Sequence, residues 1–126
     1  MWTAGVALQA LTPIKAEEIQ MPKYLITGSY TAEGAKGLIK EGGTARRDVA
    51  ERAAASVGAT VEGYYFAFGK DDFYLIIDAP GNAAVSALSL AVSAAGGAHA
   101  RTVVLITPEE MDAAHDLKPD YSPPGG

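Results

Sequence analysis

Residues 69–80 read GKDDFYLIIDAP, and this stretch decides the fold. Gly69, Lys70, Asp71 and Asp72 have the composition of a tight turn. Apolar and aromatic residues follow without interruption over residues 73–77, and residues 78–80, Asp-Ala-Pro, stop the run. A short apolar run between turn signals predicts a strand that is buried on both faces. We therefore expect the rest of the chain to cover this strand.

The segments on either side complete a hairpin and a helix. Residues 59–68, ATVEGYYFAF, predict a second strand that pairs with the first across the turn at 69–72. Its Tyr64 and Phe66 share one side, and Tyr65 lies on the other. After Pro80, small and apolar residues predict a helix from about residue 82 to 95 that is covered on more than one side.

The N-terminal half predicts a strand followed by an interrupted helix. Residues 23–30, KYLITGSY, form the strand, and Thr31 is a suitable N-cap. Two consecutive glycines, at positions 42 and 43, interrupt the helical pattern, and Thr44 is expected to cap a second segment that reaches about residue 57. In that segment Glu51 lies four residues after Arg47, so the two side chains can pair.

The C-terminal part predicts one more strand and a short helix. Residues 99–107, HARTVVLIT, form the strand, and Thr107 caps a helix that begins at Pro108. The order is βαββαβ, which predicts an α+β, ferredoxin-like fold with a four-stranded antiparallel sheet and two helices on one face. The first and third strands are then central. A second copy of the chain is the simplest cover for the other face, which would otherwise expose an apolar patch.

The chain divides into one domain and two flanking segments. Residues 21–116 hold all the predicted elements, which fits the size of one domain. Residues 1–20 are expected to be a weakly ordered extension, or else an arm that packs on a partner subunit through Trp2. Residues 117–126 are expected to be a flexible tail.

Composition excludes several classes of function. Ten basic and fifteen acidic residues give a net charge of −5, so we expect no nucleic-acid partner and no membrane surface. The absence of cysteine excludes disulfides, thiolate zinc sites and a cysteine nucleophile. We predict no metal and no cofactor, and a cytoplasmic location.

The sequence resembles the GYD domain family of small bacterial and archaeal proteins. Three pieces carry the resemblance: MPKYLITGSYTAEGAKGLIKEG at 21–42, the helix with Arg46 and Arg47, and GYYFAFGKDDFYLIIDAPGN at 63–82. The family's name refers to a glycine followed closely by Tyr-Asp in the turn before the third strand. Gly69 and Asp72 match this motif, whereas Asp71 occupies the position of the tyrosine. The resemblance implies a ferredoxin-like domain that dimerises into an α+β barrel, and it implies no particular reaction.

Five side chains are candidates for ligand binding, and the turn residues are not among them. Asp71 and Asp72 lie in a hairpin, where aspartate is favoured for its backbone hydrogen bonds rather than for acid–base chemistry. Asp78 is expected to cap the following helix or to face a ligand in the cleft between sheet and helices. The candidates combine phenol, carboxylate, imidazole and guanidinium groups, and they are Tyr30, Tyr65, Asp78, His99 and Arg101.

The interpretation that follows is a homodimer, or a higher oligomer of one chain, that binds a small apolar or aromatic molecule or a protein partner. Two alternatives remain open. One is a cofactor-free enzyme, similar to the monooxygenases and isomerases of the dimeric α+β barrel type, acting on an aromatic small molecule with Tyr30, Tyr65, Asp78 or His99 handling protons. The other is a module that only assembles.

Overall fold

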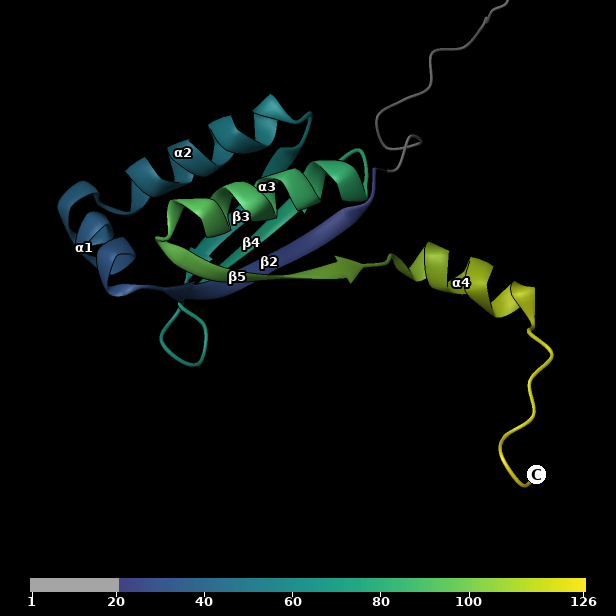
Figure 1. The fold of residues 1–126 in the computed structure, drawn as a ribbon. Coiled ribbons are helices and arrows are strands. Elements are labelled where there is room, and N and C mark those ends of the chain that lie inside the picture. The colour runs from purple at the N-terminus through teal and green to yellow at the C-terminus, as the bar shows by residue number, and fades with distance from the viewer. Residues whose placement is uncertain (1–20) are drawn as a thin grey trace, which may run out of the picture.

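The protein is an α+β domain in which three helices cover one face of a sheet (Figure 1). The computed structural model describes residues 21–126, so the predicted extension at 1–20 lies outside the described residues. Four strands form one sheet in the order β3-β4-β2-β5, with every neighbouring pair antiparallel. The strands are β2 (Lys23–Tyr30), β3 (Thr60–Phe66), β4 (Phe73–Asp78) and β5 (Ala98–Leu105).

The helices make the element order βααββαβα rather than the βαββαβ predicted. They are α1 (Ala32–Glu41), α2 (Gly43–Ser56), α3 (Asn82–Ala95) and α4 (Pro108–Leu117). The described chain has four helices, because the double glycine separates α1 from α2, as expected, and the predicted helix after Thr107 is added at the end. The antiparallel sheet and the central position of the first and third predicted strands, β2 and β4, are confirmed.

Residues 69–80 lie at the centre of the sheet, but they are not buried on both faces. Alternate side chains of β4 point to opposite faces. Phe73 and Ile77 are buried beneath the helices, whereas Tyr74, on the other side, is 38% exposed. We call this second surface, opposite the helices, the open face. The prediction of two buried faces is wrong for the single chain, because no element of the described residues covers the open face.

The hydrophobic core lies between the sheet and helices α2 and α3. Tyr24 and Ile26 of β2 pack with Phe73 and Ile77 of β4. The helices add small side chains, because Ala54 is the buried residue of α2 and Val85 that of α3. The other buried members of this core are Ala59 and Ala79.

Local capping explains where the helices begin. The Thr31 side chain accepts a hydrogen bond from the Gly34 N–H, as predicted. The expected cap at Thr44 is wrong: the N-cap is Gly42, two residues earlier, and α2 begins at Gly43. Gly42 has φ of 89°, a conformation that side chains disfavour, so glycine is required where the two helices meet.

The start of α1 is tied to the loop after α3. The Thr31 N–H donates to the Gly97 carbonyl at 3.0 Å, and the Thr31 hydroxyl donates to the Gly96 carbonyl at 2.9 Å. The backbones approach so closely that a Cβ on Gly34 would lie 1.8 Å from the Gly97 oxygen. The absence of a side chain at Gly34 therefore permits this close contact between α1 and the loop after α3.

Helix α4 continues from β5 and projects away from the body of the molecule (Figure 1). It begins with a capping box: the Thr107 side chain accepts from the Glu110 N–H at 3.0 Å, and the Glu110 carboxylate accepts from the Thr107 N–H at 2.9 Å. The predicted cap at Thr107 is confirmed. Met111 and Leu117 are exposed on this helix.

Candidate functional site

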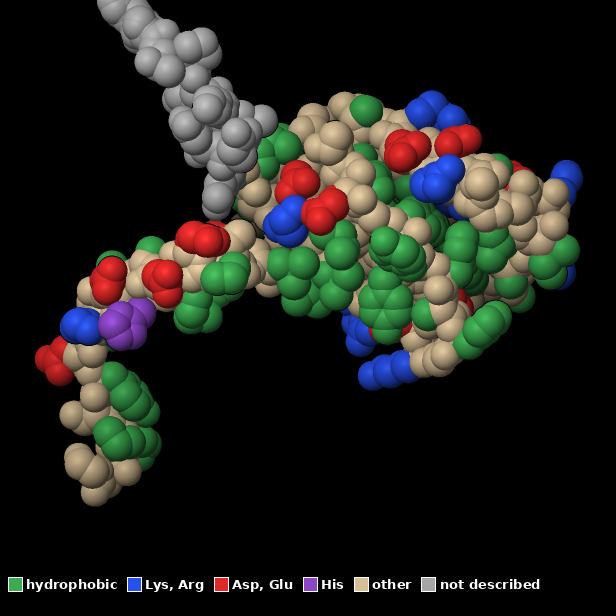
Figure 2. Space-filling view, turned by 180° about the vertical axis from the view of Figure 1, so that it is seen from behind, with side chains coloured by type: hydrophobic (Ala, Val, Ile, Leu, Met, Phe, Trp, Pro, Cys, Tyr) green, Lys and Arg blue, Asp and Glu red, His purple; other side chains and the backbone are tan. Residues whose placement is uncertain are grey.

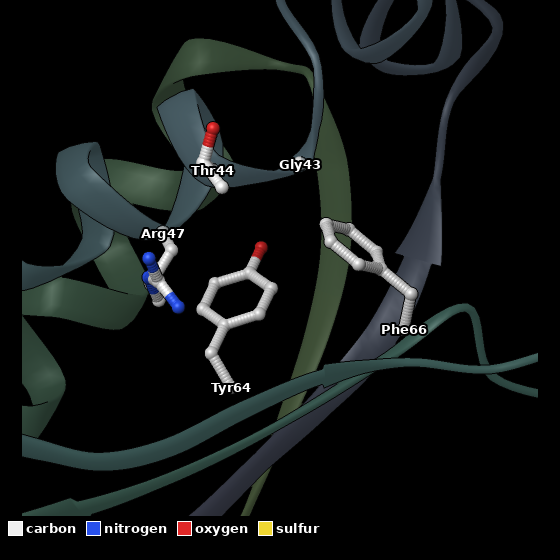
Figure 3. A pocket seen from close by; sticks show the side chains of 5 residues that line it. All are labelled: Gly43, Thr44, Arg47, Tyr64 and Phe66. Atoms are coloured by element: carbon white, nitrogen blue, oxygen red, sulfur yellow. The ribbon is translucent and has the colours of Figure 1, made fainter.

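A pocket lies on the helix side of the sheet, between the start of α2 and β3 (Figure 3). It has a volume of about 230 Å³. Figure 3 shows the Tyr64 ring between the Arg47 side chain and the Phe66 ring, with Gly43 and Thr44 above it. The lining joins two aromatic rings to a guanidinium and two hydroxyls, and it consists of Gly43, Thr44, Arg47, Tyr64 and Phe66.

The double glycine shapes one wall of the pocket. A Cβ built on Gly43 would lie 3.0 Å from the Phe66 ring, so the bare backbone of the first turn of α2 lies against that ring. Helix α2 has no side-chain cap and no acidic residue in its first turn. The positive end of the helix is therefore not neutralised by a carboxylate from its own first turn.

Two pairs of aromatic rings lie at the pocket: one pair lines it, and the other lies next to it. Tyr64 packs on Phe66 with ring centroids 5.2 Å apart, and Tyr30 packs on Phe73 at the same distance. The hydroxyls of Tyr30 and Tyr64 join the two pairs at 3.1 Å. Such tilted ring pairs favour a fixed orientation, so the Tyr64 ring is held from both sides.

The Tyr30 hydroxyl stays neutral. Burial raises its pKa well above the usual range, and the hydrogen bond with Tyr64 raises it further, while the nearby Arg46 guanidinium opposes the rise in part. Desolvation disfavours the charged phenolate. Tyr30 therefore acts as a neutral hydrogen-bonding group behind the pocket rather than as a base at neutral pH.

The two consecutive arginines have different surroundings. Arg46 lies 3.8 Å from the Glu41 carboxylate. No carboxylate within residues 21–126 comes within ion-pairing distance of Arg47. The predicted pair between Glu51 and Arg47 is therefore wrong. Arg47 faces the pocket instead, and its charge is available to a ligand.

Asp78 is not a helix cap. Its carboxylate accepts a hydrogen bond from the Lys23 ammonium at 2.8 Å, and Lys23 also pairs with Glu62. These contacts raise the pKa of Lys23, mainly through the hydrogen bond to Asp78. The start of α3 has no side-chain cap. The capping prediction is wrong because Asp78 and Lys23 face each other directly in the register of β4 and β2, on the open face.

The turn at residues 69–72 is attached to the sheet through its two aspartates. The Asp72 carboxylate accepts from the Tyr30 N–H at 2.9 Å, and the Asp72 N–H donates to the Gly28 carbonyl at 2.7 Å. Asp71 pairs with Arg101 of β5 at 2.6 Å. A Cβ on Gly69 would meet no atom within 4 Å, so this glycine is not required by close packing.

The five predicted ligand-binding residues do not converge. Tyr30 lies on the helix side, next to the pocket wall. The others lie on the open face, as the strand register requires, and they are Tyr65, Asp78, His99 and Arg101. Of these, Asp78 and Arg101 are already engaged in ion pairs. The residues that line the pocket were not among the candidates, although Gly-Gly-Thr-Ala-Arg-Arg at 42–47 signals a basic helix start.

Residues 21–126 contain no group of three or more acidic or histidine side chains arranged to hold a metal ion. Within the same range, every helix is too short or too polar to cross a membrane.

The fold and the pocket together define a small α+β protein with a one-layer antiparallel sheet and an open pocket between the start of α2 and β3. The chain matches the GYD domain model over residues 24–115 and belongs to the GYD domain family. The resemblance seen in the sequence is thereby confirmed. No curated protein and no solved structure matched the chain.

Proposed function

We propose that this GYD domain protein is a homodimer that binds a small molecule in the pocket between α2 and β3. The pocket is the observation that carries the binding role. It combines an apolar surface, from Tyr64 and Phe66, with polar groups from Arg47 and Thr44. Small-molecule sites are typically concave and apolar with a few convergent polar groups.

The open face supports the dimer. Tyr65 is 65% exposed there and Val103 is 46% exposed. Figure 2 shows hydrophobic side chains gathered over the body of the molecule. Contiguous exposed apolar surface of this kind marks interaction sites. Two copies joined through their open faces would form the dimeric α+β barrel of two ferredoxin-like domains.

Binding fits the geometry better than catalysis does. The enzyme alternative places Tyr30, Tyr65, Asp78 and His99 around one aromatic substrate. In the structure only Tyr30 lies on the pocket side of the sheet, and its raised pKa makes it a poor proton acceptor near neutral pH.

Native mass spectrometry of the purified protein tests both parts of the proposal. We expect a mass of twice the 13.0 kDa chain, with an additional small mass that is lost on denaturation. A monomer at micromolar concentration would overturn the dimer. The binding role would be overturned if the dimer carried no additional mass and if the pocket amides also showed no chemical-shift change in an NMR fragment screen. The protein would then be better described as a module that only assembles.

A further inference from the structure

We propose that the pocket selects a small aromatic carboxylate: one ring with a short anionic substituent. This inference rests on the proposed binding function and specifies the ligand class. Each part of the pocket lining corresponds to one part of the ligand.

The aromatic part of the ligand follows from the rings and the volume. Tyr64 and Phe66 pack on each other with centroids 5.2 Å apart, and both rings line the pocket, so the ring of a ligand would extend an existing aromatic cluster. At about 230 Å³, the pocket is smaller than the range typical of drug-sized ligands. A single ring therefore fits better than a fused polycycle or a nucleotide.

The anionic part follows from Arg47. Its guanidinium faces the pocket, and the described residues place no carboxylate against it. A guanidinium presents a planar pair of donors that matches a carboxylate better than it matches a point charge. The first turn of α2, bare at Gly43, adds the positive end of the helix to the same wall. Because none of the lining residues is acidic, a cationic ligand would find no carboxylate there and would meet the charge of Arg47.

The two tyrosine hydroxyls orient the site. Tyr30 holds the Tyr64 hydroxyl at 3.1 Å, so Tyr30 is a positioning residue that does not reach the pocket itself. The Thr44 hydroxyl remains in the lining as a further donor to a carboxylate oxygen.

A paired-probe titration tests the ligand class. Benzoate and its neutral isostere benzamide would be titrated into the full-length ¹⁵N-labelled protein at pH 7, while amide shifts are followed. We expect benzoate to shift the amides of Gly43, Thr44 and Arg47 saturably. Benzamide should bind about tenfold more weakly or worse, because it lacks the charge that strengthens the hydrogen bonds to arginine.

Variants localise the effect. Arg47→Gln should weaken benzoate binding by about tenfold and leave benzamide binding unchanged, because only the charged pair is lost. Arg52→Gln, on the same helix and outside the pocket lining, is the matched control and should bind both probes as the wild type does. The spectrum of each variant reports that it is folded.

Three results would overturn the ligand class: equal affinities for the two probes, unchanged benzoate affinity in Arg47→Gln, or no shift with either probe. None of these would by itself overturn the binding function. That function is decided separately, by the retained mass and the fragment screen, so a retained neutral ligand would support the proposed function and contradict this inference.

Discussion

At the scale of single residues, the main feature is Tyr30, a partly buried tyrosine whose hydroxyl lies 3.1 Å from that of Tyr64. Burial and this hydrogen bond raise its pKa well above the usual range, although the Arg46 guanidinium opposes the rise in part. The folded chain therefore holds the Tyr30 proton more tightly than the unfolded chain, in which tyrosine ionises near pH 10. A raised native pKa contributes stability below about pH 10, and this contribution is lost as the pH rises further.

The first prediction concerns this alkaline limit. We expect the free energy of unfolding to fall as the pH rises above about 10, with Lys23, whose pKa is also raised, contributing in the same direction. Tyr30→Phe should lose about 0.5–1.5 kcal/mol at pH 7 through the missing hydrogen bond, and its decline above pH 10 should be shallower. Urea unfolding followed by circular dichroism from pH 7 to 11 measures both quantities.

Tyr121→Phe is the control, because this exposed tail residue packs on no core element. It should leave the stability and its pH dependence unchanged. A slope in Tyr30→Phe identical to that of the wild type would show that the Tyr30 proton is not linked to folding.

The turn before β4 also has a residue-scale role. The Asp71 side chain is 11% exposed and pairs with Arg101. The ion pair connects the β3–β4 turn to β5, two strands away across β2. A carboxylate in this position is thus engaged in holding the turn against the edge of the sheet.

At the scale of elements, α1 contains two glycines, of which one has no room for a side chain and the other has open space around it. A Cβ on Gly34 would collide with the Gly97 carbonyl, whereas a Cβ on Gly37 would meet no atom within 4 Å. We expect Gly34→Ala to lower the free energy of unfolding by about 1–3 kcal/mol, because the loop after α3 must move. Gly37→Ala should raise it by about 0.5–1 kcal/mol, because alanine favours the helix.

Chemical denaturation of both variants and the wild type tests this pair. The two substitutions add the same methyl group to the same helix, so a difference in helix propensity cannot explain opposite signs. A stability gain in Gly34→Ala would contradict the close contact between α1 and Gly97.

The elements were largely predictable from the sequence, because each has strong local signals. Pro80 and the small residues after it set the start of α3, and Thr107 with Pro108 set that of α4. The predicted cap at Thr44 is wrong because threonine is a preferred N-cap residue in sequence, whereas the backbone conformation that makes Gly42 the cap exists only in the folded chain. The partner of Asp78 was missed for a different reason: Lys23 is 55 residues away along the chain, and only the strand register brings them together.

The site was less predictable than the fold. Candidates were chosen for their chemistry, yet strand alternation places Tyr30 on one face of the sheet and Tyr65 on the other. Which side chains line the same pocket depends on how α2 packs against β3, and no local sequence pattern determines that packing. Arg47 could be recognised as basic from the sequence, but the absence of an ion-pair partner among the described residues is a property of the folded chain.

At the scale of the whole molecule, the open face has the arrangement expected of an interface between two copies. Its charged groups are paired at both ends of the strands, by Asp71 with Arg101 and by Lys23 with Asp78. Between them lie the apolar or aromatic side chains Leu25, Tyr65, Tyr74, Ile76 and Val103. Burying this surface would leave no unpaired charge at these ion pairs, which avoids the largest cost of association.

The last prediction follows from that arrangement. Tyr74→Glu places a carboxylate in the middle of the open face, where a second copy would bury it without a partner, so we expect the dimer to dissociate to monomers. Leu90→Glu is the matched control: Leu90 is 71% exposed on α3, on the helix side of the sheet, and its substitution should leave the dimer intact. Sedimentation velocity at micromolar concentration measures the mass of each variant, and circular dichroism verifies that each is folded. If Leu90→Glu were monomeric and Tyr74→Glu remained a dimer, the interface would lie on the helical side instead of the open face. A monomeric wild type would contradict the proposed dimer altogether.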